Sequence, residues 1–345
     1  MKKLIKKRQF LSLVLLFIAS IMVTVSCAPS SETPLLGNSV NEKPVVMGFS
    51  AWPGWFPWQV AQEQKLFKAN GVNVDLKWFS GYLDSINAMA AGQLDANTQT
   101  LNDTISSVAA GSDQTIVLVN DNSTGNDKII VRKGINSTAD LKGKKIAVEE
   151  GTVDHFLLLL GLKQAGISKN DIKLVPLETG AAAAAFVAGQ VDAVGVFAPF
   201  TTTALKREGS KTLFSSKEFP GAIPDHLAVS SKLIEERPEA VQALVNSWFA
   251  TLKYIGDNPE NAYKIMADRA EVSVEDYKEY DAGTTIFTIQ DNLRAFAPGE
   301  DMKSLQYSAK QIGNFLLDSG LIKKEPDYSK LFDDRFVKTY AESLK

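Results

Sequence analysis

The chain alternates between short apolar runs and longer stretches in which apolar residues recur every three or four positions. Short runs with period-two alternation predict strands, and the longer periodicity predicts amphipathic helices. In the first part of the chain the expected strands are 43–50, 72–79, 94–100, 114–120 and 128–133, and the expected helices are 58–71, 85–93 and 104–111. Strands that alternate with helices in this way indicate a largely parallel sheet covered on both faces.

A second stretch repeats this order. Its strands are expected at 144–151, 172–177 and 191–197, and its helices at 156–166 and 181–190. The segment AGQLDA at 91–96 recurs as AGQVDA at 188–193, each time after a helix and at the start of a strand. Coincidence of common residues is one explanation, and two related lobes of similar build is the other.

From residue 231 onward the pattern is mostly helical, and we expect these helices to pack around the first lobe. The predicted fold is α/β, with two hinge-linked Rossmann-like lobes and a helical C-terminal region. The expected bounds are 44–132 with 231–345 for the first lobe and 133–230 for the second. The two crossings, and therefore the hinge, are expected at 128–133 and 226–231.

The N-terminus has the layout of a signal peptide over 1–26, with a basic stretch followed by an apolar run at 10–25. Cys27 is the only cysteine, so disulfides and cysteine-based metal sites within one chain are not expected. The sequence VTVSC at 23–27 resembles a bacterial lipoprotein box. This implies acylation of Cys27 and a flexible tether over 27–43, although an ordinary cleaved signal is the alternative.

The charge balance argues against a nucleic-acid partner. The formal net charge is −3, and removal of 1–26 takes away five basic residues, leaving 32 basic against 40 acidic residues. No basic run appears later in the chain, and no later apolar run is long enough to span a membrane.

Several pieces of the chain, in this order, resemble the nitrate/sulfonate/taurine class of periplasmic binding proteins. They are GFSAWPGWFPWQVAQEQKLFKANGVNVDLKWFSG at 48–81, AMAAGQLDA at 88–96, DLKGKKIAV at 140–148, AAFVAGQVDAVGVFAPF at 184–200 and LAVSSKLIEERPEAVQAL at 227–244. The resemblance implies the type II two-lobe fold, hinged closure around one small solute, and delivery to the permease and ATPase subunits of an ABC importer. It further implies an extracytoplasmic monomer, held at the membrane by its N-terminal lipid, with no cofactor.

Ligands of parallel sheets bind beyond the carboxyl ends of the strands. These ends, the helix-start loops and the two expected crossings give seven candidate segments. They are 48–58, 78–85, 100–104, 120–127, 149–156, 197–203 and 222–226. Together they hold 52 residues with eight acids and no lysine or arginine. An anion about 4 Å from a carboxylate would be repelled by roughly 4 kcal/mol, and a cation would gain the same amount.

The predicted ligand is therefore a small nitrogen-rich cation such as guanidine, an amidine or an amine. Tryptophan offers the best ring face for a cation, and Trp52 and Trp55 lie in the loop after the first strand, whereas Trp58 is assigned to the core. The candidate ligand-binding residues are Trp52, Trp55, Asp103, Asp127, Thr152, Asp154, Phe197 and Asp225. Asp84 and Glu149 are interpreted as solvated or capping acids. Taurine or an alkanesulfonate, nitrate and an aminopyrimidine are the alternative ligands.

A metal site, an enzyme and a surface sensor are the alternatives to a solute-binding role. His155 and His226 each follow an aspartate, but we interpret both as hydrogen-bonded histidines and expect no metal site. An enzyme is not expected, because the chain has no nucleotide-binding glycine loop and no nucleophile-elbow motif. A surface sensor with the same fold is the other alternative.

Overall fold

The computed structural model describes residues 43–345. The expected signal peptide, Cys27 and the tether up to residue 42 lie outside the described residues. Within 43–345, no helix combines the length and the apolar character needed to cross a membrane.

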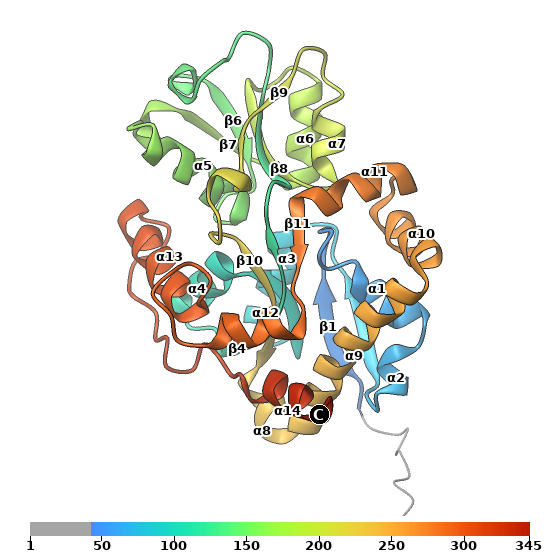
Figure 1. Ribbon diagram of the computed structural model, residues 1–345. Coiled ribbons are helices and arrows are strands. Elements are labelled where there is room, and N and C mark those ends of the chain that lie inside the picture. Colours follow the sequence, from blue (N-terminus) through green and yellow to red (C-terminus); the bar gives the residue numbers. More distant parts are fainter. Residues whose placement is uncertain (1–42) are drawn as a thin grey trace, which may run out of the picture. The chain divides into compact units, whose positions relative to one another are not determined.

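A six-stranded sheet forms the centre of the first lobe (Figure 1). Its strands, in spatial order, are β11 (Thr284–Ile286), β4 (Gln114–Ser123), β10 (Pro224–Ser230), β3 (Ala96–Thr100), β1 (Val45–Phe49) and β2 (Val74–Trp78). β1 pairs in parallel with both β2 and β3, whereas β10 is antiparallel to β3 and β4, and β11 is antiparallel to β4. The sheet is therefore mixed, not largely parallel as expected.

A five-stranded sheet forms the centre of the second lobe. Its order is β7 (Lys173–Pro176), β6 (Lys145–Val148), β8 (Ala193–Phe197), β5 (Asp127–Val131) and β9 (Lys211–Ser215). β6 is parallel to β7 and β8, and β5 is antiparallel to β8 and β9. The helices of this lobe are α5 (Val153–Gln164), α6 (Thr179–Val187) and α7 (Phe200–Ala204), with short 3₁₀ turns η1 (Thr138–Leu141), η2 (Lys169–Asp171) and η3 (Ser216–Glu218).

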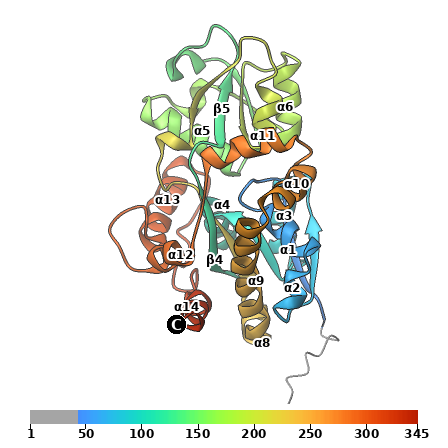
Figure 2. The same cartoon turned by 45° about the vertical axis from the view of Figure 1, so that its right-hand side comes forward.

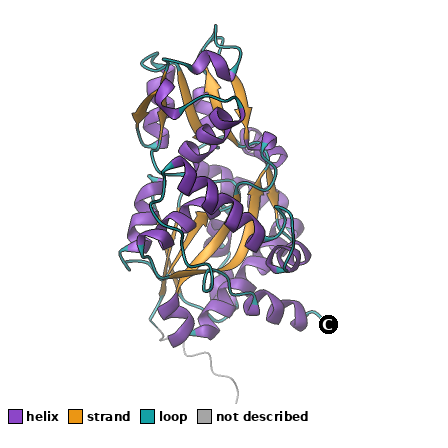
Figure 3. Cartoon of the chain, turned by 90° about the vertical axis from the view of Figure 1, so that its left-hand side faces the viewer, coloured by secondary structure: helices purple, strands orange, loops and turns teal. Residues whose placement is uncertain are grey.

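The remaining helices belong to the first lobe and flank its sheet (Figure 3). They are α1 (Pro57–Glu63), α2 (Leu66–Ala69), α3 (Tyr82–Ala90), α4 (Leu101–Ala110), α8 (Ser231–Glu236), α9 (Pro238–Asp257), α10 (Pro259–Ala270), α11 (Val274–Glu279), η4 (Tyr280–Gly283), α12 (Ile289–Phe296), α13 (Leu305–Ser319) and α14 (Arg335–Ser343). α9 runs beside α1 and α2 (Figure 2), where Trp58 lies between Phe67 and Trp248. The predicted α/β fold with a helical C-terminal region is confirmed.

Two local features differ from the sequence-based expectation. The helix expected over 58–71 is two helices, because Lys65 adopts a left-handed backbone conformation with φ of 58° between α1 and α2. The strands expected as crossings each belong to one sheet: β5 pairs only within the second lobe and β10 only within the first. The chain passes between the sheets at 124–126 and 216–223, beside which the Ser123 and Ser216 hydroxyls are hydrogen-bonded at 2.7 Å.

The repeated AGQ segments occupy equivalent places in the two lobes. The first links α3 to β3, and the second links α6 to β8. In each, the aspartate carboxylate accepts a backbone N–H from the neighbouring parallel strand, Asp95 from Val46 at 2.9 Å and Asp192 from Lys145 at 3.0 Å. The same chemistry therefore fixes the start of a central strand in both lobes.

Candidate ligand-binding site

A small cavity lies between the two sheets, where their strands and helices end. Its volume is about 10 Å³, which is close to the room that one water molecule needs. Its lining residues are Ala51, Trp52, Trp55, Tyr82, Thr100, Asp127, Val153, Phe197 and Asp225. All seven segments chosen from the sequence contribute at least one of these residues. In this closed arrangement the space holds little more than one water molecule, so a larger ligand requires the cavity walls to move apart.

Four aromatic rings surround this cavity in a closed cycle of contacts, and we call them the aromatic cage. Trp52 contacts Trp55 with ring centroids 6.4 Å apart, and Trp55 contacts Tyr82 at 5.3 Å. Tyr82 contacts Phe197 at 6.2 Å, and Phe197 returns to Trp52 at 6.3 Å. The contacts are edge-on or tilted, an arrangement that leaves ring faces free to meet a ligand.

Asp121 is held against the loop that carries the two cage tryptophans. The Trp52 indole Nε1 donates to Asp121 Oδ1 at 2.9 Å, and both groups are buried. The backbone of Gly54 lies so close that a Cβ there would sit 1.8 Å from Asp121 Oδ2. Gly54 is therefore required to let the carboxylate into this position.

Asp121 also faces Asp225, its register partner on the neighbouring antiparallel strand. The two carboxyl groups are close enough to share a hydrogen bond, which requires a proton on one of them. The register shifts by one residue between Asp225 and His226, so that Asn120 of β4 is passed over and Asp225 pairs with Asp121. Successive strand residues point to opposite faces, and Asp225 faces the cavity while His226 stays in the core.

Asp103 lies in the first turn of α4, directly behind the cavity wall. Its Oδ2 accepts the Thr100 hydroxyl at 2.7 Å, and its Oδ1 accepts the Asn102 amide at 2.7 Å. The Thr100 backbone N–H donates to the Tyr82 hydroxyl at 2.9 Å, so this carboxylate and the cage are joined through one residue.

Asp154 occupies the corresponding place in the first turn of α5. The Thr179 hydroxyl lies 3.1 Å from Asp154 Oδ2 and 3.2 Å from Glu149 Oε2. Glu149 Oε1 in turn accepts the Leu83 backbone N–H at 3.2 Å. Glu149 is therefore buried and caps a helix of the other lobe, so of its two interpretations the capping role holds and the solvated one does not. Asp84 is exposed, as expected.

Six carboxyl groups thus converge on this region: Asp103, Asp121, Asp127, Glu149, Asp154 and Asp225. We call them the acidic cluster. Among residues 43–345, none of the six forms an ion pair with a lysine or arginine, although the Lys128 charge acts on Asp127 at longer range. No donor in this part of the chain reaches Asp127 Oδ2, Asp154 Oδ1 or the Oδ2 atoms of Asp121 and Asp225.

Burial without a compensating cation makes ionisation of the cluster unfavourable. Burial raises the pKa of Asp103, Asp127 and Glu149 to about 7 and that of Asp121 to about 8. The pKa values of Asp154 and Asp225 are also raised well above the ordinary range, first by burial and then by neighbouring carboxylates. The cluster therefore lacks a positive partner.

The two histidines have local structural roles. Nε2 of His226 is hydrogen-bonded to the Thr104 hydroxyl at 2.8 Å, and Nδ1 of His155 accepts the Gly151 N–H at 3.3 Å. Burial lowers the pKa of His226 to about 3 and that of His155 to about 4. Within the described chain, no three His, Cys, Asp or Glu side chains are arranged to hold a metal ion.

The sequence-based candidate residues fall into two groups according to whether they reach the cavity. Trp52, Trp55, Asp127, Phe197 and Asp225 line the cavity, whereas Asp103 and Asp154 are buried behind it.

Thr152 is buried at the start of α5, and its hydroxyl donates a hydrogen bond to the Glu149 carbonyl oxygen at 2.9 Å. Sequence reasoning did not single out Tyr82, Asp121 or Thr179. Tyr82 and Asp121 lie inside the seven segments, which was the available signal for them, whereas Thr179 lies outside all seven.

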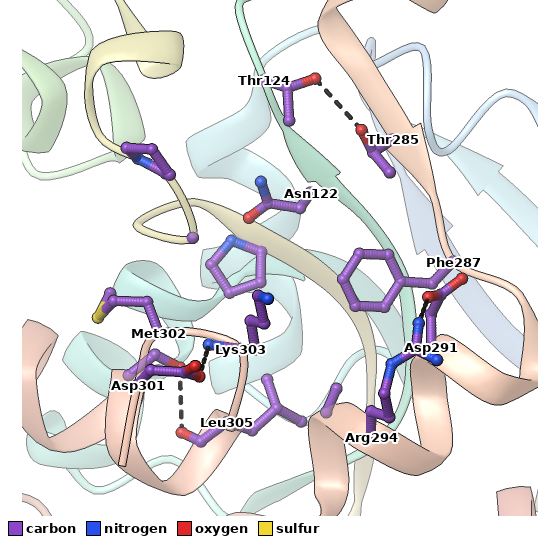
Figure 4. A pocket seen from close by; sticks show the side chains of 15 residues that line it. Asn122, Thr124, Thr285, Phe287, Asp291, Arg294, Asp301, Met302, Lys303 and Leu305 are labelled. Atoms are coloured by element: carbon purple, nitrogen blue, oxygen red, sulfur yellow. Dashed lines mark hydrogen bonds and ion pairs between the residues drawn. The ribbon is translucent and has the colours of Figure 1, made fainter. Parts of the chain in front are cut away.

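A larger pocket of about 710 Å³ lies beside β4 and β11 (Figure 4). Its acids already have partners, because Asp291 interacts with Arg294 and Thr288, and Asp301 accepts the Lys303 N–H. Phe287 and Leu305 add an apolar wall. The acidic side chains of this pocket are thus already satisfied, unlike those of the acidic cluster.

Comparison with known proteins identifies the family of the chain. The NMT1-like family profile matches residues 38–268. The taurine-binding periplasmic protein of Escherichia coli (strain K12) is 30% identical over 294 residues, covering 81% of this chain and 89% of that protein. Among solved structures, the alkanesulfonate-binding protein SsuA from Xanthomonas axonopodis pv. citri, bound to MOPS, has a TM-score of 0.72 at 19% identity, covering 85% of this chain and 99% of that one.

An enzyme shares the fold as well. The desulfurization enzyme DSZB matches with a TM-score of 0.62 at 18% identity, covering 87% of this chain and 99% of that one. At this identity the similarity shows the fold alone, whereas the sequence relationship to the taurine-binding protein is closer. The chain belongs to the NMT1-like family and is a solute-binding protein of the nitrate/sulfonate/taurine class, with the type II two-lobe fold.

Proposed function

We propose that this protein captures a small nitrogen-rich cation, with guanidinium as the reference ligand and amidinium or a small amine as related ones. The observation that carries the proposal is the acidic cluster, in which buried carboxyl oxygens lack donors and no lysine or arginine forms an ion pair with them. A buried charge without a partner costs several kcal/mol, so a ligand that supplies positive charge and N–H donors gains strongly.

Guanidinium matches these acceptors in geometry and charge. It is planar and donor-only, and carboxylates accept its N–H groups two at a time. Asp127 and Asp225 reach the cavity from different lobes, so one ligand between them would join both sheets. At about 4 Å and an effective dielectric of 20, each such pair contributes roughly 4 kcal/mol before desolvation is subtracted.

The aromatic cage supports the same ligand class. A cation over a tryptophan or tyrosine face in a desolvated site gains about 2 kcal/mol. The small cavity favours a group of few atoms, such as guanidinium, over an extended amine.

A pure anion fits this site poorly. Helix N-termini are the usual places where proteins hold oxyanions. Here the first turns of α4 and α5 carry the buried carboxyl groups of Asp103 and Asp154. Nitrate or an alkanesulfonate would oppose ionisation of both groups, whereas a cation would favour it.

Taurine is the second candidate, because a taurine-binding protein is among the relatives. Its ammonium group could pair with the acidic cluster, and the unpaired indole N–H of Trp55 in the cavity wall is a donor for its sulfonate. An aminopyrimidine stacked on the cage tryptophans is a further alternative.

The remaining parts of the proposal follow from family membership. The protein acts outside the cytoplasm, passes its solute to the permease and ATPase subunits of an ABC importer, and binds the solute without converting it. Acylation of Cys27 would hold it at the membrane.

Calorimetric titration with matched ligand pairs tests the ligand class. Guanidinium is compared with urea, which has nearly the same shape but no charge, and taurine with ethanesulfonate. We expect binding of guanidinium, at least 100-fold weaker binding of urea, and no binding of ethanesulfonate or nitrate. Tight binding of ethanesulfonate or nitrate, with guanidinium inert, would overturn the proposal.

A further inference from the structure

Glu149 joins the two lobes at a point next to the cavity. It follows β6 of the second lobe, and its Oε1 accepts the Leu83 N–H of α3 in the first lobe at 3.2 Å. α3 begins after Gly81, which has no side chain to cap the helix. An acceptor from the other lobe therefore satisfies one of the free N–H groups in the first turn of α3.

The same carboxylate is connected to the ligand site through Thr179. The Thr179 hydroxyl is within hydrogen-bonding distance of both Glu149 Oε2 and Asp154 Oδ2, at 3.2 and 3.1 Å. A hydroxyl has one proton, so it donates to one carboxylate at a time. Asp154 and Glu149 therefore compete for a single donor.

We propose that Glu149 is a positioning residue that acts as a latch between the lobes, and that Thr179 couples this latch to occupancy of the site. This rests on the proposed function, in which the cluster receives a cation. When a cationic ligand supplies charge and donors near Asp154, the Thr179 hydroxyl is free to turn to Glu149. Glu149 then holds the Leu83 N–H, and with it Tyr82 of the aromatic cage, in the closed arrangement.

The charged surroundings of Glu149 are consistent with this role. Glu178, at the start of α6, and Asp84, in α3, both disfavour its ionisation, as do burial and the neighbouring Asp154 and Asp103 carboxylates. A positive charge near Asp154 and Asp103 relieves part of this repulsion. Ligand binding and closure therefore favour each other through the same carboxylate.

The test measures lobe closure and ligand release separately. Spin labels at the exposed positions Lys68 and Lys206, placed in different lobes of the Cys27→Ser chain, report the distribution of interlobe distances with and without guanidinium. Stopped-flow tryptophan fluorescence gives the association and dissociation rate constants. The variants are Glu149→Ala, Glu149→Gln and Thr179→Val, and the control is Glu150→Ala, which removes the same charge from an exposed neighbour.

We expect Glu149→Ala to lower the closed population and raise the dissociation rate constant about tenfold, with association changed less than twofold, because one hydrogen bond to a charged acceptor is lost. Without ligand, Glu149→Gln should have the closed population of the parent chain, since its amide oxygen still accepts the Leu83 N–H. The ligand should increase the closed population of Glu149→Gln less than that of the parent chain. Thr179→Val should abolish that increase.

An unchanged closed population and dissociation rate in Glu149→Ala would overturn the latch, and so would an effect that Glu150→Ala reproduces. Failure of guanidinium to bind the parent chain would instead contradict the proposed function. In that case the ligand-free distance distributions of the parent and Glu149→Ala chains still decide whether the latch exists.

Discussion

Asp121 and Asp225 face each other across neighbouring antiparallel strands, so that two buried carboxyl groups meet at the edge of one small cavity. Two carboxyl groups in such contact do not both ionise readily, and a proton shared between them is the simplest way to relieve the repulsion. This pair therefore makes the state of the empty site depend on pH, and a cationic ligand would take over the role of the proton.

The first prediction concerns pH. Burial raises the pKa of Asp103, Asp127 and Glu149 to about 7 and of Asp121 to about 8, whereas unfolded carboxyl groups titrate near 4. Between about pH 4 and pH 8 the folded, ligand-free protein binds more protons than the unfolded chain. Its free energy of unfolding should therefore fall as the pH rises through this window.

Thermal unfolding measured from pH 5 to pH 8, with and without saturating guanidinium, checks this. We expect the stabilisation by guanidinium to be larger at pH 8, because the ligand binds the ionised carboxylates. The combined variant Asp121→Asn with Asp225→Asn should show a flatter dependence. A ligand-free protein that becomes more stable between pH 5 and pH 8 would contradict the prediction.

The second prediction concerns Gly54. Its replacement by alanine places a Cβ 1.8 Å from Asp121 Oδ2, so the carboxylate or the loop must move. We expect guanidinium affinity to drop at least tenfold by calorimetry. Gly256 in α9 is the matched control, because a Cβ there meets no atom within 4 Å, and alanine should leave affinity unchanged and stabilise the helix by about 0.5–1 kcal/mol. Equal affinities of the Gly54→Ala and parent chains would show that Asp121 is not needed.

The third prediction separates the cage from the core. Trp52→Phe keeps an aromatic ring but removes the Nε1 donor to Asp121. Affinity for guanidinium should fall by about 1–2 kcal/mol, since a hydrogen bond to a charged acceptor and part of the cation–ring contact are lost. Trp248→Phe, in the core beside Trp58, should lower the unfolding free energy without a change in affinity. A loss of affinity in Trp248→Phe, with unchanged affinity in Trp52→Phe, would place the binding site elsewhere.

The fourth prediction concerns Asp154. Asp154→Asn keeps the size of the side chain and an acceptor for Thr179 but removes the negative charge. We expect the dissociation constant to rise by a factor that corresponds to more than about 1 kcal/mol. The unfolding free energy at pH 8 should not decrease, because a buried charge is removed. Asp257→Asn, on the exposed end of α9, is the control, and a similar loss there would point to a general charge effect.

The sequence predicted the fold class and the neighbourhood of the site, because both depend on periodicity and chain order. The carboxyl ends of parallel strands meet at one edge whatever their detailed register. That rule, together with the helix-start loops and the expected crossings, was sufficient to choose seven segments, each of which contributes to the cavity. The assignment of Trp58 to the core followed from its place in the first amphipathic helix, where the structure has it.

The contacts that define the chemistry were not predictable, because they depend on long-range register. Asp121 meets Asp225 only because β10 pairs with β4 and because β4 carries an extra residue, Asn120, in a bulge at this point. Glu149 reaches Leu83 only when the end of β6 approaches the first turn of α3 from the other lobe, although 66 positions separate the two residues. The chain crosses between the lobes at other positions than expected for the same reason, because the residues of a strand do not determine which of the two sheets it joins.

The path of the chain also has a consequence for folding. β4 is flanked on one side by β11, and the backbone of Ile116 is bonded to residues 331 and 333 near the C-terminus. The second lobe is built from one continuous stretch, so it can form while the rest of the polypeptide is still being delivered. The first lobe stays incomplete until that last stretch arrives, and a chain cut before residue 284 would leave β4 as an open edge that invites aggregation.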